Sequence, residues 1–333
     1  MSAVSLGDLA RTFMLRRQNV ALKADAQRLS TEVITGLAAD TRRKVGGDLA
    51  VLNSMDSSLA LLAARSSITT ETAMTASAMQ TALAQMDGVA SGLSLDLLSL
   101  TPGGSSTTID QLGEQAEDAF RSAVSALNTQ VGDRSIFGGT RPQAAAVVDA
   151  DALLGLLDTV AAGAASAADV QTAIGNWFDS PAGYAGLAYG GGDVLAPVTV
   201  GSGEKVTLGV TANDPALRET LKGLAMAAML NRGALAGASA DRAELAQIAG
   251  KVLVQGHGER VDLAARLGRT EARIDQAASA AAAEATALKI ARKDLLGIDE
   301  YEAASRLQAT QSQLETLYSL TARLSRLSLT DYL

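Results

Sequence analysis

With 333 residues, the chain is long enough to bury a large core or to divide into two or three domains. Its apolar content of 47% comes mostly from alanine and leucine, and only 3% of residues are aromatic, which favours long, closely packed helices over a compact enzyme. The formal net charge of −8, mixed in sign along the chain, argues against nucleic-acid binding, the absence of cysteine excludes disulfides and thiolate chemistry, and no apolar run is long enough to predict a membrane-spanning helix.

The N-terminal pattern predicts a long helix over residues 5–37. Leu6, Phe13 and Val20 follow one another at steps of seven, and so do Leu22 and Leu29. Such steps are typical of a coiled-coil seam, the narrow apolar strip along which two helices pack. Charged residues interrupt this segment, so we expect no cleavable signal peptide.

A second helix is expected after Gly46 and Gly47, with apolar residues spaced helically from Leu52 to Met86. Residues 101–108, rich in Gly, Ser and Thr with one Pro, predict a loop. A third helix begins near Ile109 and is expected to continue to the glycines that start at Gly132. The first 138 residues therefore predict an almost entirely helical structure.

The middle of the chain has a different composition. Residues 140–215 contain four of the five prolines and several glycines. Residues 151–162 predict a short helix. Two alternating runs, 198–200 and 206–211, flank a turn at Gly201–Gly203 and predict a β-hairpin. The sequence thus places a small α+β insert between two helical halves.

Helices return after the insert. Asp214 is placed to cap a helix that starts with Pro215. From about Ser239 one long helical pattern extends to Lys293. The acidic residues at 299–302 fit the first turn of a last helix, where negative charge complements the helix dipole.

Residues 301–333 carry leucines at several angles around the last predicted helix. An intramolecular coiled coil with the N-terminal helix would cover part of them, and contact with other copies of the chain would cover the rest. The expected fold is mainly α: a long antiparallel coiled coil or bundle formed by both termini, with the small α+β insert in the middle. We expect five segments, namely an N-terminal helix (1–40), N-terminal rod helices (41–139), the insert (140–213), C-terminal rod helices (214–297) and a C-terminal helix (298–333).

The sequence offers no catalytic constellation. His257 is the single histidine and has no cysteine with which to share a metal, so it is interpreted as a loop or helix-junction residue. Ser202 and Lys205 match the spacing of a serine–lysine motif, but their glycine-rich surroundings favour a hairpin tip. Trp177 could line a ligand site, although a small local core is the simpler interpretation. We expect no enzyme, no cofactor and no metal site.

Three motifs resemble one known family. Leu127-Asn128 is followed by Gly-Asp-Arg-Ser-Ile-Phe-Gly-Gly-Thr at 132–140, residues 307–318 and 324–333 have the pattern of a family C-terminal helix, and Asn19 and Leu29-Ser30 precede Gly36. Together they resemble the flagellin superfamily over residues 1–139 and 214–333. The block at 134–139 and the ending Leu-Ser-Leu-Thr-Asp-Tyr-Leu are most similar to its hook–filament junction branch, the hook-associated protein 3 group.

The resemblance implies a structural protein of the bacterial flagellum that is extracellular and exported without a signal peptide by the flagellar type III apparatus. It implies that the terminal helices form an inner tube and that the insert is an outer domain. The implied partners are further copies of the chain, hook-associated protein 1, flagellin, and an export chaperone at the C-terminus, with no nucleic acid and no membrane.

The function implied in this way is mechanical: joining hook to filament by self-association of the terminal helices. Filament flagellin is the first alternative, and a soluble coiled-coil adaptor with ordered termini is the second. The predicted subunit contacts lie near both ends of the chain, at Leu6, Leu9, Phe13, Val20, Leu307, Leu314, Leu317, Leu324, Leu327 and Tyr332.

Overall fold

The computed structural model describes residues 6–101, 105–201 and 203–330, and the side chains of 10–323 within those ranges. The described chain is dominated by helices, and its strands form two small antiparallel sheets. It divides into two compact units, one formed by the residues up to 62 and from 282 onward, the other by residues 63–281. The prediction of a mainly α fold with a small α+β component is confirmed.

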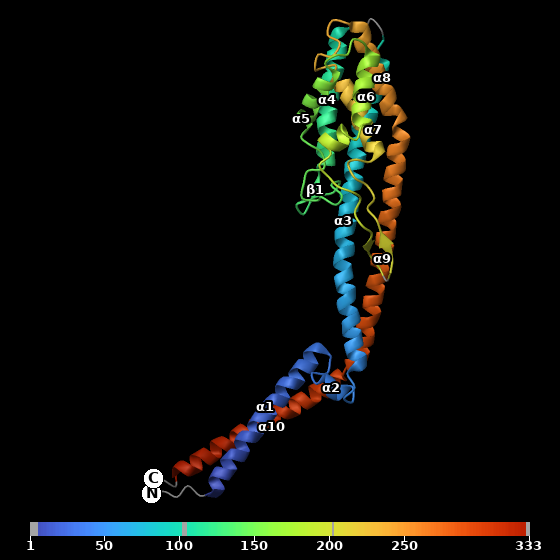
Figure 1. Ribbon diagram of the computed structural model, residues 1–333. Coiled ribbons are helices and arrows are strands. Elements are labelled where there is room, and N and C mark those ends of the chain that lie inside the picture. The colour runs from blue at the N-terminus through green and yellow to red at the C-terminus, as the bar shows by residue number, and fades with distance from the viewer. Residues whose placement is uncertain (1–5, 102–104, 202, 331–333) are drawn as a thin grey trace. The chain divides into compact units, whose positions relative to one another are not determined.

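The first unit is built around the two terminal helices. Helix α1 (Leu6–Thr35) and helix α10 (Glu300–Thr330) lie side by side (Figure 1). The short α2 (Thr41–Lys44) follows α1, with Asp40 accepting a hydrogen bond from the backbone nitrogen of Arg43 as its N-cap. This unit also contains the start of α3 (Ala50–Ser99) and the end of α9 (His257–Leu296), linked by an ion pair of 2.9 Å between Asp56 and Arg292.

The second unit is a helical bundle around α7 (Pro215–Ala228). Helix α7 packs against α4 (Ser106–Leu127) and α8 (Ser239–Gln255). Most of its residues are buried, including Leu217, Leu221 and Leu224. A helix with most of its residues buried lies in a core, so α7 is the centre of this bundle.

Two further helices cover the bundle. Helix α5 (Ala150–Ala161) is capped by Asp149, and α6 (Ala167–Asp179) by Ser166, which accepts from the Asp169 backbone nitrogen. A single π-helical turn, η1 (Tyr184–Ala188), follows α6. Helix α5 matches the short helix predicted at 151–162, whereas α6 and the π turn were not predicted.

Each sheet is a hairpin of two antiparallel strands, and each strand is two residues long. Strand β1 (Gln130–Val131) pairs with β2 (Arg134–Ser135), and β3 (Val198–Thr199) pairs with β4 (Lys205–Val206). The hairpin predicted around 201–203 is therefore confirmed. Its paired strands are shorter than the predicted strand runs 198–200 and 206–211. The first hairpin occupies a segment where we expected helix, because α4 already ends at Leu127.

The structure confirms two predicted helix starts, at Pro215 and at Ser239. Asp214 caps α7 by accepting a hydrogen bond from the Ala216 nitrogen, with Pro215 at the first position. The long pattern from Ser239 is helical to Leu296, with a one-residue interruption at Gly256 that separates α8 from α9. His257 is the first residue of α9, which agrees with its interpretation as a junction residue. Among the described residues, none of the helices is long and apolar enough to cross a membrane.

Candidate functional site

The terminal helices meet along a coiled-coil seam. On α1 the half-buried or buried positions follow one another at alternating steps of four and three, and on α10 the same rhythm occurs. This spacing places one strip of each helix against its partner. The seam positions are Leu15, Asn19, Leu22, Ala26, Leu29 and Val33 on α1, and Ala303, Leu307, Thr310, Leu314 and Leu317 on α10.

The two helices are antiparallel. The linkers that follow α1 and precede α10 form a bridge between Leu37 and Gly297. Ala38 donates to the carbonyl of Leu296 at 2.9 Å, and Ile298 donates to that of Gly36 at 3.2 Å. Toward the other end of the pair, Lys23 Nζ lies 5.7 Å from the ring centroid of Tyr318.

A buried carboxylate stabilises the end of α1. Glu32, with 7% of its surface exposed, accepts from Arg28 Nη1 at 3.1 Å and from the backbone nitrogen of Ala39 at 3.2 Å. Gly36 has φ +67°, and a Cβ there would lie 3.2 Å from Glu300 Oε1. Glycine therefore suits both the left-handed turn and the close approach of α10.

Three large apolar side chains of α1 point away from the seam, and we call them the outward face: Phe13, Met14 and Val20. Each of them is 68% exposed. Arg11, Arg17 and Gln18 border Phe13 and Met14 in a shallow groove. Large apolar side chains gathered at one surface are typical of an association site.

The structure separates the predicted contact residues into two groups. Phe13 and Val20, which their spacing of seven placed in the predicted coiled-coil seam, lie instead on the outward face. Leu307 and Leu314 are half-buried in the seam, and Leu317 is buried there with 5% exposed. That any of them contacts another subunit stays a prediction.

The structure does not describe the side chains of five predicted contact residues. Leu6 and Leu9 belong to α1, and Leu324 and Leu327 to α10, but their side chains are outside the described set. Tyr332 lies outside the described residues altogether.

Sequence reasoning missed half of the seam. Steps of seven link Leu6, Phe13 and Val20 as well as Leu22 and Leu29, yet the structure assigns Val20 and Leu22 to different faces. The alternating steps of four and three from Leu15 to Val33 are the signal that could have separated them. Because seam residues such as Ala26 and Asn19 are small or polar, the pattern of large apolar residues did not show these steps.

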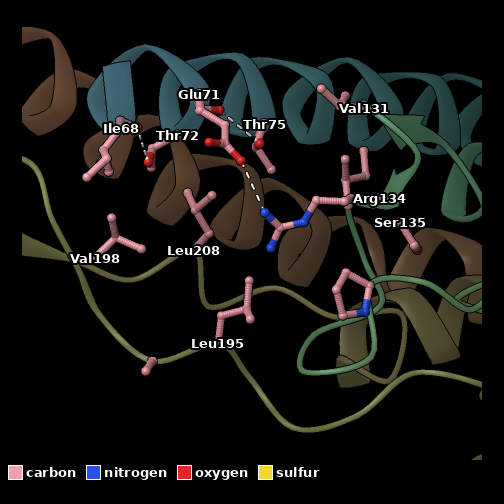
Figure 2. Close-up of a pocket in the computed structure, with 13 residues that line it drawn as sticks. Ile68, Glu71, Thr72, Thr75, Val131, Arg134, Ser135, Leu195, Val198 and Leu208 are labelled. Carbon is pink, nitrogen blue, oxygen red and sulfur yellow. Dashed lines mark hydrogen bonds and ion pairs between the residues drawn. The ribbon is translucent and has the colours of Figure 1, made fainter. Parts of the chain in front are cut away.

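A cavity of about 260 Å³ lies between α3 and the extended segments of the second unit. Figure 2 shows Arg134 reaching across it to Glu71 on α3, with Nη1 and Oε1 3.1 Å apart. Ile68, Leu195 and Leu208 give the cavity mostly apolar walls. The arrangement offers no nucleophile paired with a base, so it does not form a catalytic site.

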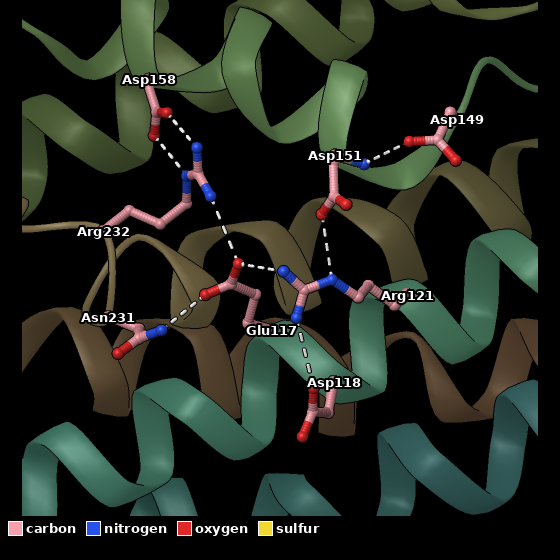
Figure 3. Close-up of polar contacts among 8 residues, drawn as sticks. All are labelled: Glu117, Asp118, Arg121, Asp149, Asp151, Asp158, Asn231 and Arg232. Carbon is pink, nitrogen blue, oxygen red and sulfur yellow. Dashed lines mark hydrogen bonds and ion pairs between the residues drawn. The ribbon is translucent and has the colours of Figure 1, made fainter.

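A polar cluster on the second unit ties three elements together. Glu117 on α4 accepts from Arg121 at 2.7 Å, from Arg232 at 3.2 Å and from Asn231 at 2.5 Å (Figure 3). Arg232 also forms a two-pronged ion pair with Asp158 on α5. Every one of these charges has an opposite partner, which is typical of a structural cluster.

The remaining candidates also have structural roles. Trp177 lies 5.1 Å from Phe178 between ring centroids, and Phe178 stacks with the buried Tyr184 at 5.3 Å. This confirms the small aromatic core. His257 Nδ1 is 3.1 Å from Asp87 Oδ1. Over the part of the chain that the structure describes, no group of His, Asp or Glu is arranged to hold a metal.

Comparison with known proteins finds a family similarity at the C-terminal helices. Residues 260–333 match the family described as the bacterial flagellin C-terminal helical region. No curated protein shows significant sequence similarity to the chain. The match covers α10 and most of α9, and it agrees with the predicted resemblance of the C-terminal segment to the flagellin superfamily.

One solved structure shares the fold of the chain. A protein described as flagellar hook-associated, from Vibrio parahaemolyticus, superposes with a TM-score of 0.51 at 13% identity, covering 73% of this chain and 95% of that one. FlgL of Bacillus cereus aligns at 14% identity with a TM-score of 0.40, covering 75% of this chain and 100% of that one. The first of these shows a shared fold.

Proposed function

We propose that this protein, of the flagellin superfamily by its C-terminal helical region, joins the flagellar hook to the filament as a purely mechanical part. The family similarity supports a structural role in the flagellum. The position at the junction is our proposal, based on the motifs at 134–139 and 327–333.

The outward face carries the proposal. Phe13, Met14 and Val20 remain exposed although α1 is already paired with α10. Each exposed apolar side chain favours association by about 25 cal/mol for every Å² that it buries. A face that contacts a different surface on the next copy produces rings or open helical arrays, which is the geometry that an axial structure needs.

We further propose how the segments of the chain are arranged in this assembly and which proteins they contact. The paired terminal helices would form the inner tube, and residues 140–213 would be the outer domain. The partners would be copies of the chain, hook-associated protein 1 on one side and flagellin on the other, with an export chaperone bound to the C-terminal segment before assembly. Export would use the flagellar type III apparatus.

Filament flagellin is the second candidate, because the matched family is that of the flagellin C-terminal region. The two roles differ in what the protein does alone. A flagellin polymerises into long filaments from purified protein, whereas a junction protein forms a short layer and stops.

Loss of the gene tests the proposal. In a motile strain that lacks it, we expect intact hooks without filaments and flagellin released into the medium. Hooks with normal filaments would contradict any axial role, and loss of the main filament subunit from the medium would favour flagellin. Removal of residues 307–333 alone should reproduce the null phenotype while most of the second unit stays folded.

A further inference from the structure

Two residues of the outward face, Phe13 and Val20, belong to a longer strip along α1. Its members follow one another at alternating steps of three and four residues, and every one of them is exposed. Such steps place side chains on one side of a helix, which here is the side opposite the seam with α10. We call this the second strip of α1: Ala10, Phe13, Arg17, Val20, Ala24, Gln27, Thr31 and Ile34.

Helix α10 also carries a strip on the side away from the seam. Its members are exposed and follow the same alternating steps, but most of them are small or polar. We call this the second strip of α10: Tyr301, Ser305, Gln308, Ser312, Glu315, Ser319 and Ala322. Large side chains on one helix fit between small ones on another, so the two second strips are suited to pack together.

Each second strip contains one charged residue, and the two charges are opposite. Arg17 is the charged member on α1, and Glu315 is the charged member on α10. Within the part of the chain that the structure describes, neither forms an ion pair. Opposite charges placed face to face across a helix contact favour that contact and fix its register.

An antiparallel pairing that sets Arg17 opposite Glu315 aligns the two second strips over their whole length. The facing residues are then Phe13 with Ser319, Val20 with Ser312, Ala24 with Gln308, Gln27 with Ser305, and Thr31 with Tyr301. In each of these pairs a long or bulky side chain faces a shorter one. A shift by one heptad in either direction would set Glu315 opposite Ala10 or Ala24 and remove the ion pair.

Contacts between two like strips lack this match. Two second strips of α1 in parallel would set Arg17 against Arg17, and two of α10 would set Glu315 against Glu315, so that like charges repel. Aligned antiparallel, two second strips of α1 would set Arg17 opposite the neutral Gln27. The charges therefore favour the contact between unlike strips.

We propose that the second strip of α1 docks on the second strip of α10 in a neighbouring copy, antiparallel, with Arg17 paired to Glu315. The two strips lie on opposite sides of the α1–α10 pair, so two copies in contact still present one free strip at each end. Copies therefore add in a row and do not close as a dimer. The inference rests on the proposed function and deepens it by naming the surface that receives the outward face.

The absence of cysteine makes a direct test possible. In the purified, concentrated full-length protein, Val20→Cys and Ser312→Cys place two thiols on opposite sides of the α1–α10 pair. A disulfide between them can therefore form only between copies. Under mild oxidation, we expect V20C/S312C to give covalent dimers, trimers and larger species. V20C alone and S312C alone should stay monomeric.

Two register controls use the same strip. V20C/S319C and V20C/S305C move the second thiol by one heptad, about 10 Å along α10. Because a disulfide requires Cα atoms within about 7 Å, we expect both to crosslink at least about tenfold more slowly than V20C/S312C.

The charge pair is tested in the V20C/S312C protein. Arg17→Glu should slow crosslinking roughly fivefold, because it replaces attraction with repulsion at an exposed pair. Adding Glu315→Arg restores opposite charges and should restore the rate. All substituted positions are exposed, so circular dichroism should show unchanged helix content.

Equal crosslinking in V20C/S312C and the register controls would overturn the proposal. So would covalent dimers of V20C alone, or a charge reversal that Glu315→Arg does not rescue. These results are independent of the proposed function, because crosslinking uses purified protein, whereas the junction role is judged from hooks and filaments of a mutant strain.

Discussion

Arg260 on α9 donates from Nε to Oδ1 of Asp87 on α3 at 2.7 Å. The arginine is buried, with 5% exposed, and its Nη1 also donates to the carbonyl of Leu253 at 3.1 Å. His257 approaches the same carboxylate oxygen from the first turn of α9. Asp87 is therefore the group that fixes the start of α9 within the second unit.

Asp87→Asn should make the stability of this unit less sensitive to acid. Burial raises the pKa of Asp87, but hydrogen bonds from Arg260 and His257 outweigh it and hold the pKa below its usual range. A carboxylate with a lowered folded pKa stabilises the fold above its unfolded pKa, and that contribution is lost as the pH falls through the folded value.

We therefore expect D87N to cost about 2 kcal/mol at pH 7, less than for a fully buried pair because Asp87 is partly exposed. The difference from the unmodified protein should shrink toward pH 3. Urea unfolding followed by circular dichroism at both pH values measures it. The exposed Asp262→Asn on the same helix should have little effect, and an equal loss in both variants would refute the assignment.

Glu117→Gln should destabilise the cluster that joins α4, α5 and the turn after α7. The substitution keeps the shape but removes the charge that Arg121 and Arg232 share. We expect a loss of about 1–3 kcal/mol, because a buried carboxylate bound by two guanidinium groups is replaced by a neutral amide. Exposed Glu114 on the same helix supplies the control E114Q, and no difference between the two would contradict this account.

Gly113→Ala and Gly88→Ala should have opposite effects. A Cβ at Gly113 would lie 2.7 Å from the backbone nitrogen of Asn231, whereas one at Gly88 meets nothing within 4 Å. We expect G113A to lower the thermal midpoint with a loss of about 1–3 kcal/mol. G88A, in an exposed helix interior, should gain about 0.5–1 kcal/mol. A neutral G113A would mean that α4 and the turn at Asn231 are less closely packed than described.

Local signals predicted local structure well. The Asp214–Pro215 pair sufficed to place the start of α7, because capping depends on adjacent residues. The end of α4 was placed too late, since helix-compatible residues continue past Leu127 and the hairpin at 130–135 depends on tertiary hydrogen bonds such as Ser135 to Pro142. The helical pattern from Ser239 did not show where α8 ends, because helical hydrogen bonds continue across Gly256, and only the interpretation of His257 pointed to a junction there.

The sequence predicted only part of the arrangement of the terminal helices. Periodicity showed that both termini carry apolar strips, but it could not tell which strip of α1 pairs with α10. Val20 and Leu22 are similar side chains two positions apart, and only the position of α10 assigns one to the outward face and the other to the seam.

The most direct test of the outward face is electron microscopy of flagella from a strain whose only copy carries Phe13→Ser and Val20→Ser. Both side chains are exposed, so the purified variant should keep its helix content, and Val254→Ser with Val261→Ser, exposed in the second unit, is the matched control. We expect hooks without filaments and released flagellin for F13S/V20S, and normal filaments for the control. Normal filaments on F13S/V20S cells would contradict the claim that copies associate through the outward face.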